Sequence, residues 1–280
     1  MDALKPAERG GLWAKARDTR HRARRLLEGN LLTLVLALVV LLTMAVGVYM
    51  VSVGLYAVGY LAMGEALWLD IATYGLMGLL GVLLVLPSAV AVWRLACLFT
   101  VQAGLYTPSA DLPIASARPT PEQLFYPFTS LRAYGRTLAV GLETLGWTVL
   151  TVGIPAMGYR ALALTFADLA NRGLHTTLCT LLTGVSLLLC IAFGVLMLFL
   201  SGRRAGFGFF VFAHEVLPLA EVRRYFKGFR RGFARPFILR ISLTGWIALS
   251  VVAILVPFVI HTAPYALCCS AIYATELERA

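Results

Sequence analysis

Long uncharged apolar stretches alternate along the chain with shorter segments that carry most of the charge. Three of these stretches are longer than the roughly 20 apolar residues that a helix needs to cross the hydrocarbon core of a membrane. The pattern therefore predicts membrane-spanning helices at residues 31–62, 71–99 and 175–201.

Two more spans are predicted at residues 137–165 and 237–260, where a basic and aromatic segment leads into an apolar stretch. These two regions resemble each other at a spacing of 99 residues. The matched pairs are Arg132 with Arg231, Tyr134 with Phe233, Arg136 with Arg235, and Gly146-Trp147 with Gly245-Trp246. A single span lies between the two regions, so both would cross the membrane in the same direction, as a parallel duplication requires.

The last apolar stretch, residues 261–275, is too short for a standard span and contains Pro264 near its start. Its ~14 residues beyond His261 reach only part of the way across the hydrocarbon core. We expect it to lie along the outer face without crossing, and a sixth span is the alternative. The predicted fold class is an all-α polytopic transmembrane helical bundle with five spans, in which residues 31–280 form one membrane domain.

Basic residues gather in the segments outside the predicted spans. Residues 1–30 predict a basic amphipathic helix on the inner leaflet. Residues 203–235 predict a basic cytoplasmic loop that contains an amphipathic piece at 207–219. With the amino terminus in the cytoplasm, 21 of the 24 lysines and arginines lie on the inner side. Because such a bias sets the orientation of membrane proteins, the sequence predicts a multi-pass inner-membrane protein whose amino terminus lies in the cytoplasm.

The composition separates the chain from soluble proteins. It is 60% hydrophobic and only 14% charged, with a mean hydropathy of +0.82, and a soluble domain does not need so much apolar material to fill its core. In a soluble protein a net charge of +10 would suggest a nucleic-acid partner. Here the basic residues flank hydrophobic spans, so we expect no nucleic-acid partner.

No motif for catalysis or metal binding is complete. His214-Glu215 begins like the H-E-x-x-H motif of zinc peptidases, but Pro218 stands where the second histidine would be. The five cysteines show no C-x-x-C spacing, and no glycine-rich phosphate loop occurs. The adjacent Cys268 and Cys269 are candidates for acylation or oxidation. We therefore expect no enzymatic activity, no metal and no other cofactor.

One charged residue, Glu143, lies well inside a predicted span. Counted from Arg136 at about 1.5 Å per residue, it sits about 10 Å into the hydrocarbon core. An isolated carboxylate is costly there, so we expect a basic partner, first Arg240 and next Arg94. Such a pair would be either a static contact that fixes the bundle or a proton- or substrate-coupled site.

The 203–235 loop supplies the candidate lipid contacts, which are Arg223, Arg224, Lys227, Arg230 and Arg231. These residues either orient the protein and cover apolar surface with their stems, or bind anionic headgroups. The leading function is a non-enzymatic membrane scaffold or accessory protein that contacts anionic membrane lipids, partner membrane proteins or further copies of itself. The alternative is a small transporter or permease component built around the intramembrane carboxylate.

Short motifs near both ends of the chain point to a family. They are residues 16–17 and 25–30 at the start, and Lys227-Gly228, 237–239, Ser242-Leu243, Gly245-Trp246, Pro264-Tyr265 and Ile272-Tyr273 at the end. These motifs resemble those of a bacterial integral-membrane family described as a domain of unknown function. The middle of the chain departs from that pattern. The resemblance implies an integral protein of the bacterial inner (cytoplasmic) membrane, and brings no activity, cofactor or catalytic residue.

Overall fold

A computed structural model describes residues 11–64, 67–107, 117–173, 175–201, 204, 206–228, 236–239, 241–243 and 262–279. Throughout these residues the chain is helical where it is regular, with no strand. It divides into two compact units. Unit 1 is Met1–Leu142 with Ala205–Ala280, and unit 2 is Glu143–Arg204.

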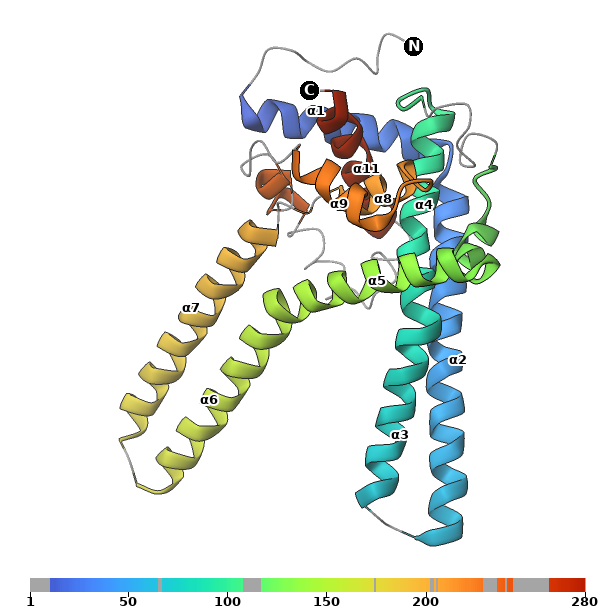
Figure 1. Cartoon of the computed structure of the whole chain (residues 1–280). Coiled ribbons are helices and arrows are strands. Elements are labelled where there is room, and N and C mark those ends of the chain that lie inside the picture. The colour runs from blue at the N-terminus through green and yellow to red at the C-terminus, as the bar shows by residue number, and fades with distance from the viewer. Residues whose placement is uncertain are drawn as a thin grey trace. The chain divides into compact units, whose positions relative to one another are not determined.

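Unit 1 is built on a pair of long antiparallel helices. In chain order it begins with α1 (Leu12–Glu28), α2 (Leu31–Met63) and α3 (Leu67–Leu80). The π-helical turn η2 (Gly81–Val85) then joins α3 to α4 (Leu86–Gln102). The rod formed by α3, η2 and α4 runs beside α2, as Figure 1 shows.

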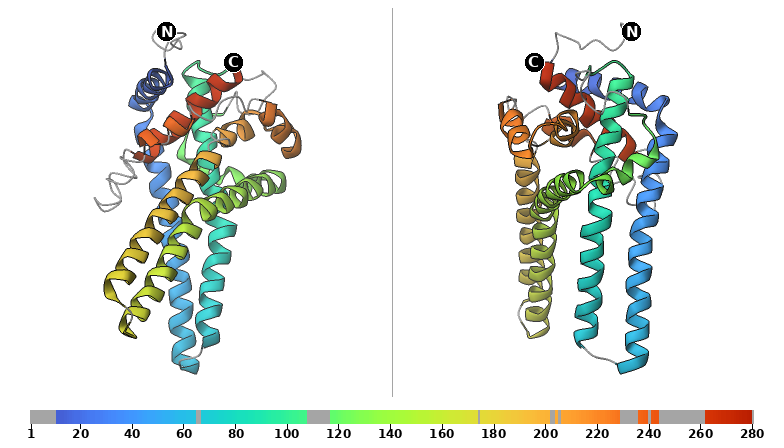
Figure 2. Two further views of the ribbon diagram at one scale, coloured as in Figure 1. Left: turned by 90° about the vertical axis from the view of Figure 1, so that its left-hand side faces the viewer. Right: turned by 45° about the vertical axis from the view of Figure 1, so that its right-hand side comes forward.

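The remaining helices of unit 1 gather at one end of this pair (Figures 1 and 2). They are the 3-10 helix η4 (Pro121–Thr129), α8 (Phe207–Ala213), α9 (Leu219–Gly228) and α11 (Ala263–Arg279). The helix α5 (Leu131–Thr148) begins in unit 1 and continues into unit 2. We call α1, η4, α8, α9, α11 and the adjoining ends of α2 and α4 the cap.

The short helix α8 lies in the core of the cap. All seven of its residues are buried, among them Phe209, Phe210 and Phe212, which are fully enclosed. It packs against α4 so closely that a Cβ added to Gly208 would come within 2.6 Å of the Trp93 ring. The prediction of an amphipathic surface piece at 207–219 was therefore wrong over α8, because its apolar residues cover the whole helix.

The carboxyl-terminal helix α11 packs lengthwise against α1. Ala23, Leu26 and Leu27 of α1 belong to one buried cluster with Cys268, Cys269 and Ile272 of α11. Arg22 and Glu276 form an ion pair across the contact. The apolar side of α1 thus packs on protein, not on lipid as expected. Residues 263–275 lie beside residues 12–28, so the prediction that these two segments occupy opposite membrane faces was wrong.

Unit 2 is an antiparallel helical hairpin. It contains the end of α5, the π-helical turn η5 (Val149–Gly153), α6 (Ile154–Asn171) and α7 (Thr176–Ser201). The helices α6 and α7 pack against each other along their length. Among the described residues of this unit only Cys179 and Ser186 are buried.

Both units contain a π-helical turn directly before a proline-containing helix start, at Pro87 and at Pro155. Proline has no N–H, and its ring clashes with the carbonyl four residues earlier, so the wider turn relieves the clash. In unit 1 that carbonyl belongs to Leu83 and accepts a hydrogen bond from the Tyr134 hydroxyl, at 3.1 Å. In unit 2 it belongs to Thr151, and Gly194 of α7 lies against it.

Four helical segments are long and apolar enough to cross a membrane: Leu31–Ala62, Trp68–Gln102, Leu131–Asn171 and Thr176–Met197. They confirm the first four predicted spans as helices of membrane-spanning length. The fifth predicted span, 237–260, lies mostly outside the described residues and stays a prediction.

Candidate functional site

A buried ion pair lies at the centre of the cap. Nε of Arg94, on α4, donates to Oε1 of Glu215 at 2.7 Å, and each side chain is only 6% exposed. Both residues lie in apolar surroundings. Arg94 is in the most buried part of α4, and Glu215 follows the end of α8 by two residues. A buried charge is tolerated only when it is paired and hydrogen-bonded, so each residue fixes the other in place.

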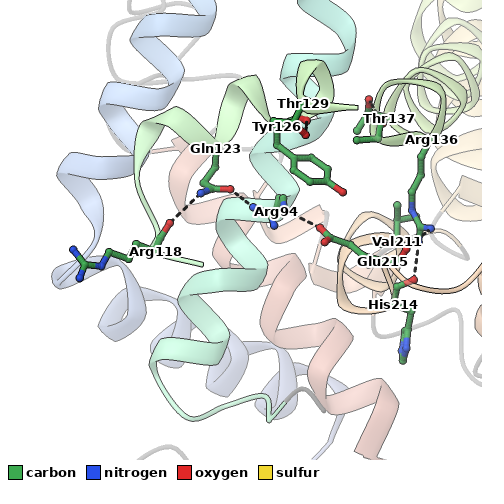
Figure 3. A network of polar contacts seen from close by, with 11 residues as sticks. Arg94, Arg118, Gln123, Tyr126, Thr129, Arg136, Thr137, Val211, His214 and Glu215 are labelled. Atoms are coloured by element: carbon green, nitrogen blue, oxygen red, sulfur yellow. Dashed lines mark hydrogen bonds and ion pairs between the residues drawn. The ribbon is translucent and has the colours of Figure 1, made fainter. Parts of the chain in front are cut away.

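The helix η4 completes the shell around Arg94, as Figure 3 shows. Nη1 of Arg94 also donates to the side-chain oxygen of Gln123. The guanidinium carbon lies 4.1 Å from the centre of the Tyr126 ring, a favourable position for a cation over an aromatic face. Burial, and then the Glu215 carboxylate, raise the pKa of Tyr126, which therefore keeps its proton at neutral pH.

A second arginine, Arg136 of α5, holds the end of α8. Its guanidinium donates to four backbone carbonyl oxygens, at distances from 2.5 to 3.2 Å. These carbonyls belong to Val211, His214, Glu215 and Leu217. The last carbonyls of a helix have no partner within it and carry partial negative charge, so a cation placed there stabilises the helix end. Arg136 thereby positions the segment that carries Glu215 (Figure 3).

A third polar contact joins α11 to α8 and α9. Nε2 of His214 lies 3.1 Å from Oε1 of Glu278, and the Tyr225 hydroxyl donates to the same oxygen at 3.5 Å. The His214 ring packs edge-on against Tyr225. Burial, and then the Glu278 carboxylate, raise the pKa of Tyr225. Together with the Arg22–Glu276 pair, this contact fastens α11 at its carboxyl-terminal end.

These contacts pair charged groups of the cap with groups on neighbouring helices and so join those helices to one another. Over the part of the chain that the structure describes, no group of three or more histidine, cysteine or acidic residues could hold a metal ion.

The residues predicted to form an intramembrane polar pair, Glu143 and Arg94, lie in different units, and each pairs with another residue. Glu143, in unit 2, pairs with Arg204, whose guanidinium carbon lies 4.8 Å from the centre of the Trp147 ring. Arg94, in unit 1, pairs with Glu215. Arg240 lies outside the described residues, so a contact between Glu143 and Arg240 stays a prediction.

The predicted lipid-facing residues lie partly on α9. Arg223, Arg224 and Lys227 are exposed on this helix, whose buried side is formed by Val222 and Phe226. Arg230 and Arg231 lie outside the described residues. Arg224 and Lys227 thus expose their side chains on a helix whose other side packs in the cap.

The cysteine pair of α11 is enclosed by protein. Cys268 and Cys269 are both fully buried. Burial raises the pKa of the Cys269 thiol to about 12, and it raises that of Cys268 as well. Since the thiolate is the reactive form, the predicted acylation or oxidation is disfavoured in the folded protein.

Sequence reasoning missed Glu215, Arg136 and Glu278 as members of the site. Glu215 had been considered only as part of an incomplete zinc motif. A usable signal was present, because Glu215 is the only acidic residue in the apolar and aromatic stretch 205–220. A lone carboxylate in such surroundings calls for a basic partner.

Comparisons with protein-family models, with curated proteins and with solved structures found no match. The resemblance of the chain ends to a bacterial membrane family stays a prediction.

Proposed function

We propose that the protein is a membrane-anchored scaffold or accessory protein, without enzymatic activity, whose cap is the module that contacts partners. The observation that carries this proposal is where the buried charges lie. In the described part of unit 1, the Arg94–Glu215 and Arg22–Glu276 pairs lie in the cap, and Arg136 of α5 donates to carbonyls at the end of α8, in the cap. The parts of α2 and α3 that lie away from the cap expose apolar side chains, and no two charged side chains meet there among the described residues.

The proposed topology places α1 and α11 together on the cytoplasmic side of the membrane. The first four spans bring the chain back to its starting side, and α11 packs on α1. Leu239 and Leu243 are buried in the same cluster as Cys268 and Ile272. A single crossing between residues 243 and 262 would separate these groups by about the 30 Å of the hydrocarbon core. We therefore propose that residues 239–243 and α11 lie on the same side of the membrane, which is the cytoplasmic side by the positive-inside bias. The bacterial inner membrane is the location that the family resemblance implies.

Contact with anionic lipid is part of the proposal for α9. Its exposed residues Arg223, Arg224 and Lys227 follow one another at helical spacing on the side away from Val222 and Phe226. Basic residues near an anionic surface each contribute about 1 kcal/mol of attraction. The same helix therefore orients the cap against the inner leaflet.

A small transporter is the second candidate, and the Glu143–Arg204 pair favours it. The carboxylate is placed within an apolar helix, and its partner lies over Trp147. Ionisable residues inside spans often mark ion or substrate pathways. The pair equally well fastens the open end of the α6–α7 hairpin, because Arg204 follows α7 and Glu143 precedes η5.

Reconstitution and cross-linking separate the two candidates. Purified protein in proteoliposomes should give no proton or cation flux above that of empty vesicles. A photo-cross-linker at Arg223 or Arg224, in native membranes, should give a discrete adduct with another membrane protein, and one at Asp168 in unit 2 should not. Flux that is lost in Glu143→Gln would overturn the scaffold proposal.

A further inference from the structure

The helix α1 has one side that the cap uses and one that it leaves free of packing. Its buried residues Ala23, Leu26 and Leu27 belong to one cluster with residues of α11 and α2. The opposite side carries exposed aromatic, basic and acidic residues at a spacing of three or four positions. They are Trp13, Arg17, His21, Arg24 and Glu28. Trp13 is 61% exposed. We call these five residues the α1 stripe.

The stripe lies away from the bilayer that α2 would cross. With 33 residues, α2 is about 50 Å long, whereas the hydrocarbon core measures about 30 Å. The excess lies at the end joined to α1, because Leu34 and Ala37 are buried in the cap while most later residues are exposed. This places α1 roughly 15–20 Å from the core boundary. Figure 1 shows α1 at that end of α2.

This distance from the hydrocarbon boundary weakens the electrostatic attraction between α1 and anionic headgroups. Headgroups extend only about 5–7 Å beyond the hydrocarbon, and the Debye length is about 8 Å at physiological salt. Arg17 and Arg24 are therefore separated from the anionic surface by about a Debye length or more. Lipid charge therefore does not account for a basic helix in this place.

We propose that the α1 stripe docks an acidic polypeptide segment of a partner protein, which rests on the proposed scaffold function and names its partner class. The charge is complementary, since Arg17 and Arg24 stand one above the other at helical spacing. An exposed tryptophan beside arginines is the composition of protein-binding hot spots. Oε1 of Glu28 lies 3.9 Å from Nε of Arg24, so the stripe carries both positive and negative charge. A negative charge in the stripe disfavours a phosphate backbone and suits a protein partner.

The test measures peptide binding by the full-length protein in nanodiscs of zwitterionic lipid. The probe is a fluorescent glutamate-rich peptide titrated at physiological and at high salt. We expect Arg17→Glu with Arg24→Glu to weaken binding by about tenfold or more, and Trp13→Ala by several-fold. Arg223→Glu with Arg224→Glu, an equal change of charge on α9, should weaken binding by no more than about twofold.

Several results would overturn the proposal. The first is failure of the unchanged protein to bind the peptide. The second is an equal loss of peptide affinity in the α1 and the α9 charge-reversed variants. The third is displacement of the fluorescent peptide by anionic vesicles or by an oligonucleotide at a lower concentration than unlabelled peptide requires. Arg17→Gln with Arg24→Gln, which avoids like-charge contacts, should show a smaller loss in the same direction. Ion flux in proteoliposomes would remove the scaffold function without changing these binding results, so the two failures are distinguishable.

Discussion

Unit 1 and unit 2 both contain antiparallel pairs of long apolar helices, but they bury their side chains very differently. The fully enclosed large side chains, such as Phe99, Phe209 and Phe210, all belong to unit 1 among the described residues. In unit 2 only Cys179 and Ser186 are buried in the part that the structure describes. The cap is packed like a soluble domain, whereas the hairpin presents nearly all of its surface to its surroundings. The free energy of unfolding should therefore be more sensitive to mutation in unit 1 than in unit 2.

The largest expected effect comes from breaking the buried ion pair of the cap. Glu215→Ala leaves the Arg94 guanidinium buried without its carboxylate, which should lower the free energy of unfolding by about 3–5 kcal/mol. Asp168→Ala is the matched change in unit 2, where the Asp168–Arg172 pair is exposed, and it should cost less than about 1 kcal/mol. Denaturant titration in detergent, followed by circular dichroism, gives both values. Equal losses would contradict the comparison.

Glycine-to-alanine changes should have opposite signs in the two units. Gly208→Ala pushes a methyl group against the Trp93 ring and should destabilise unit 1 by about 1–3 kcal/mol. Gly184→Ala on α7 meets open space and should stabilise its helix by up to about 1 kcal/mol, because alanine is the better helix former. The same titration measures both. A stabilising Gly208→Ala would show that α8 does not pack against α4 as described.

A smaller loss of stability is expected when the Leu83 carbonyl, which Pro87 cannot hydrogen-bond, loses its Tyr134 partner. Tyr134→Phe removes the hydroxyl that donates to the Leu83 oxygen and should cost about 1 kcal/mol. Tyr159→Phe in α6 removes a hydroxyl from unit 2 and should be close to neutral. Thermal unfolding of the two variants in the same detergent makes the comparison, and a neutral Tyr134→Phe would mean that the hydrogen bond does not hold η2.

The smallest effect concerns reactivity. Because burial raises the pKa of Cys269 to about 12, its thiol stays protonated at pH 8. Iodoacetamide should leave Cys268 and Cys269 unmodified in the folded protein and modify both after denaturation, as mass spectrometry of the α11 peptide can show. Rapid modification without denaturation would place α11 outside the cap.

The apolar pattern predicted the first four spans because a long uncharged run needs no tertiary information to be recognised. It did not predict the cap. Residues 207–213 and 263–275 are apolar enough to suggest a membrane surface, but protein covers them instead. Hydrophobicity alone does not distinguish burial in lipid from burial in protein.

The partners of the charged residues were beyond reach for a different reason. Arg94 and Glu215 are 121 residues apart, and Glu143 and Arg204 are 61 apart. The sequence showed that Glu143 needs a partner, since an isolated charge in apolar surroundings is costly. It could not show which of several distant residues the fold brings near, because that depends on how the helices pack.

The central claim is that α1 and α11 pack together on one side of the membrane. The most direct test is cross-linking of Arg22→Cys with Glu276→Cys in native membranes, in a chain whose own cysteines are replaced, by a short bifunctional thiol reagent. The Arg22–Glu276 ion pair predicts an intramolecular cross-link, and a pairing of Arg22→Cys with Asp168→Cys should give none. Absence of the first cross-link, together with labelling of position 276 by an impermeant reagent from outside intact cells, would contradict the account.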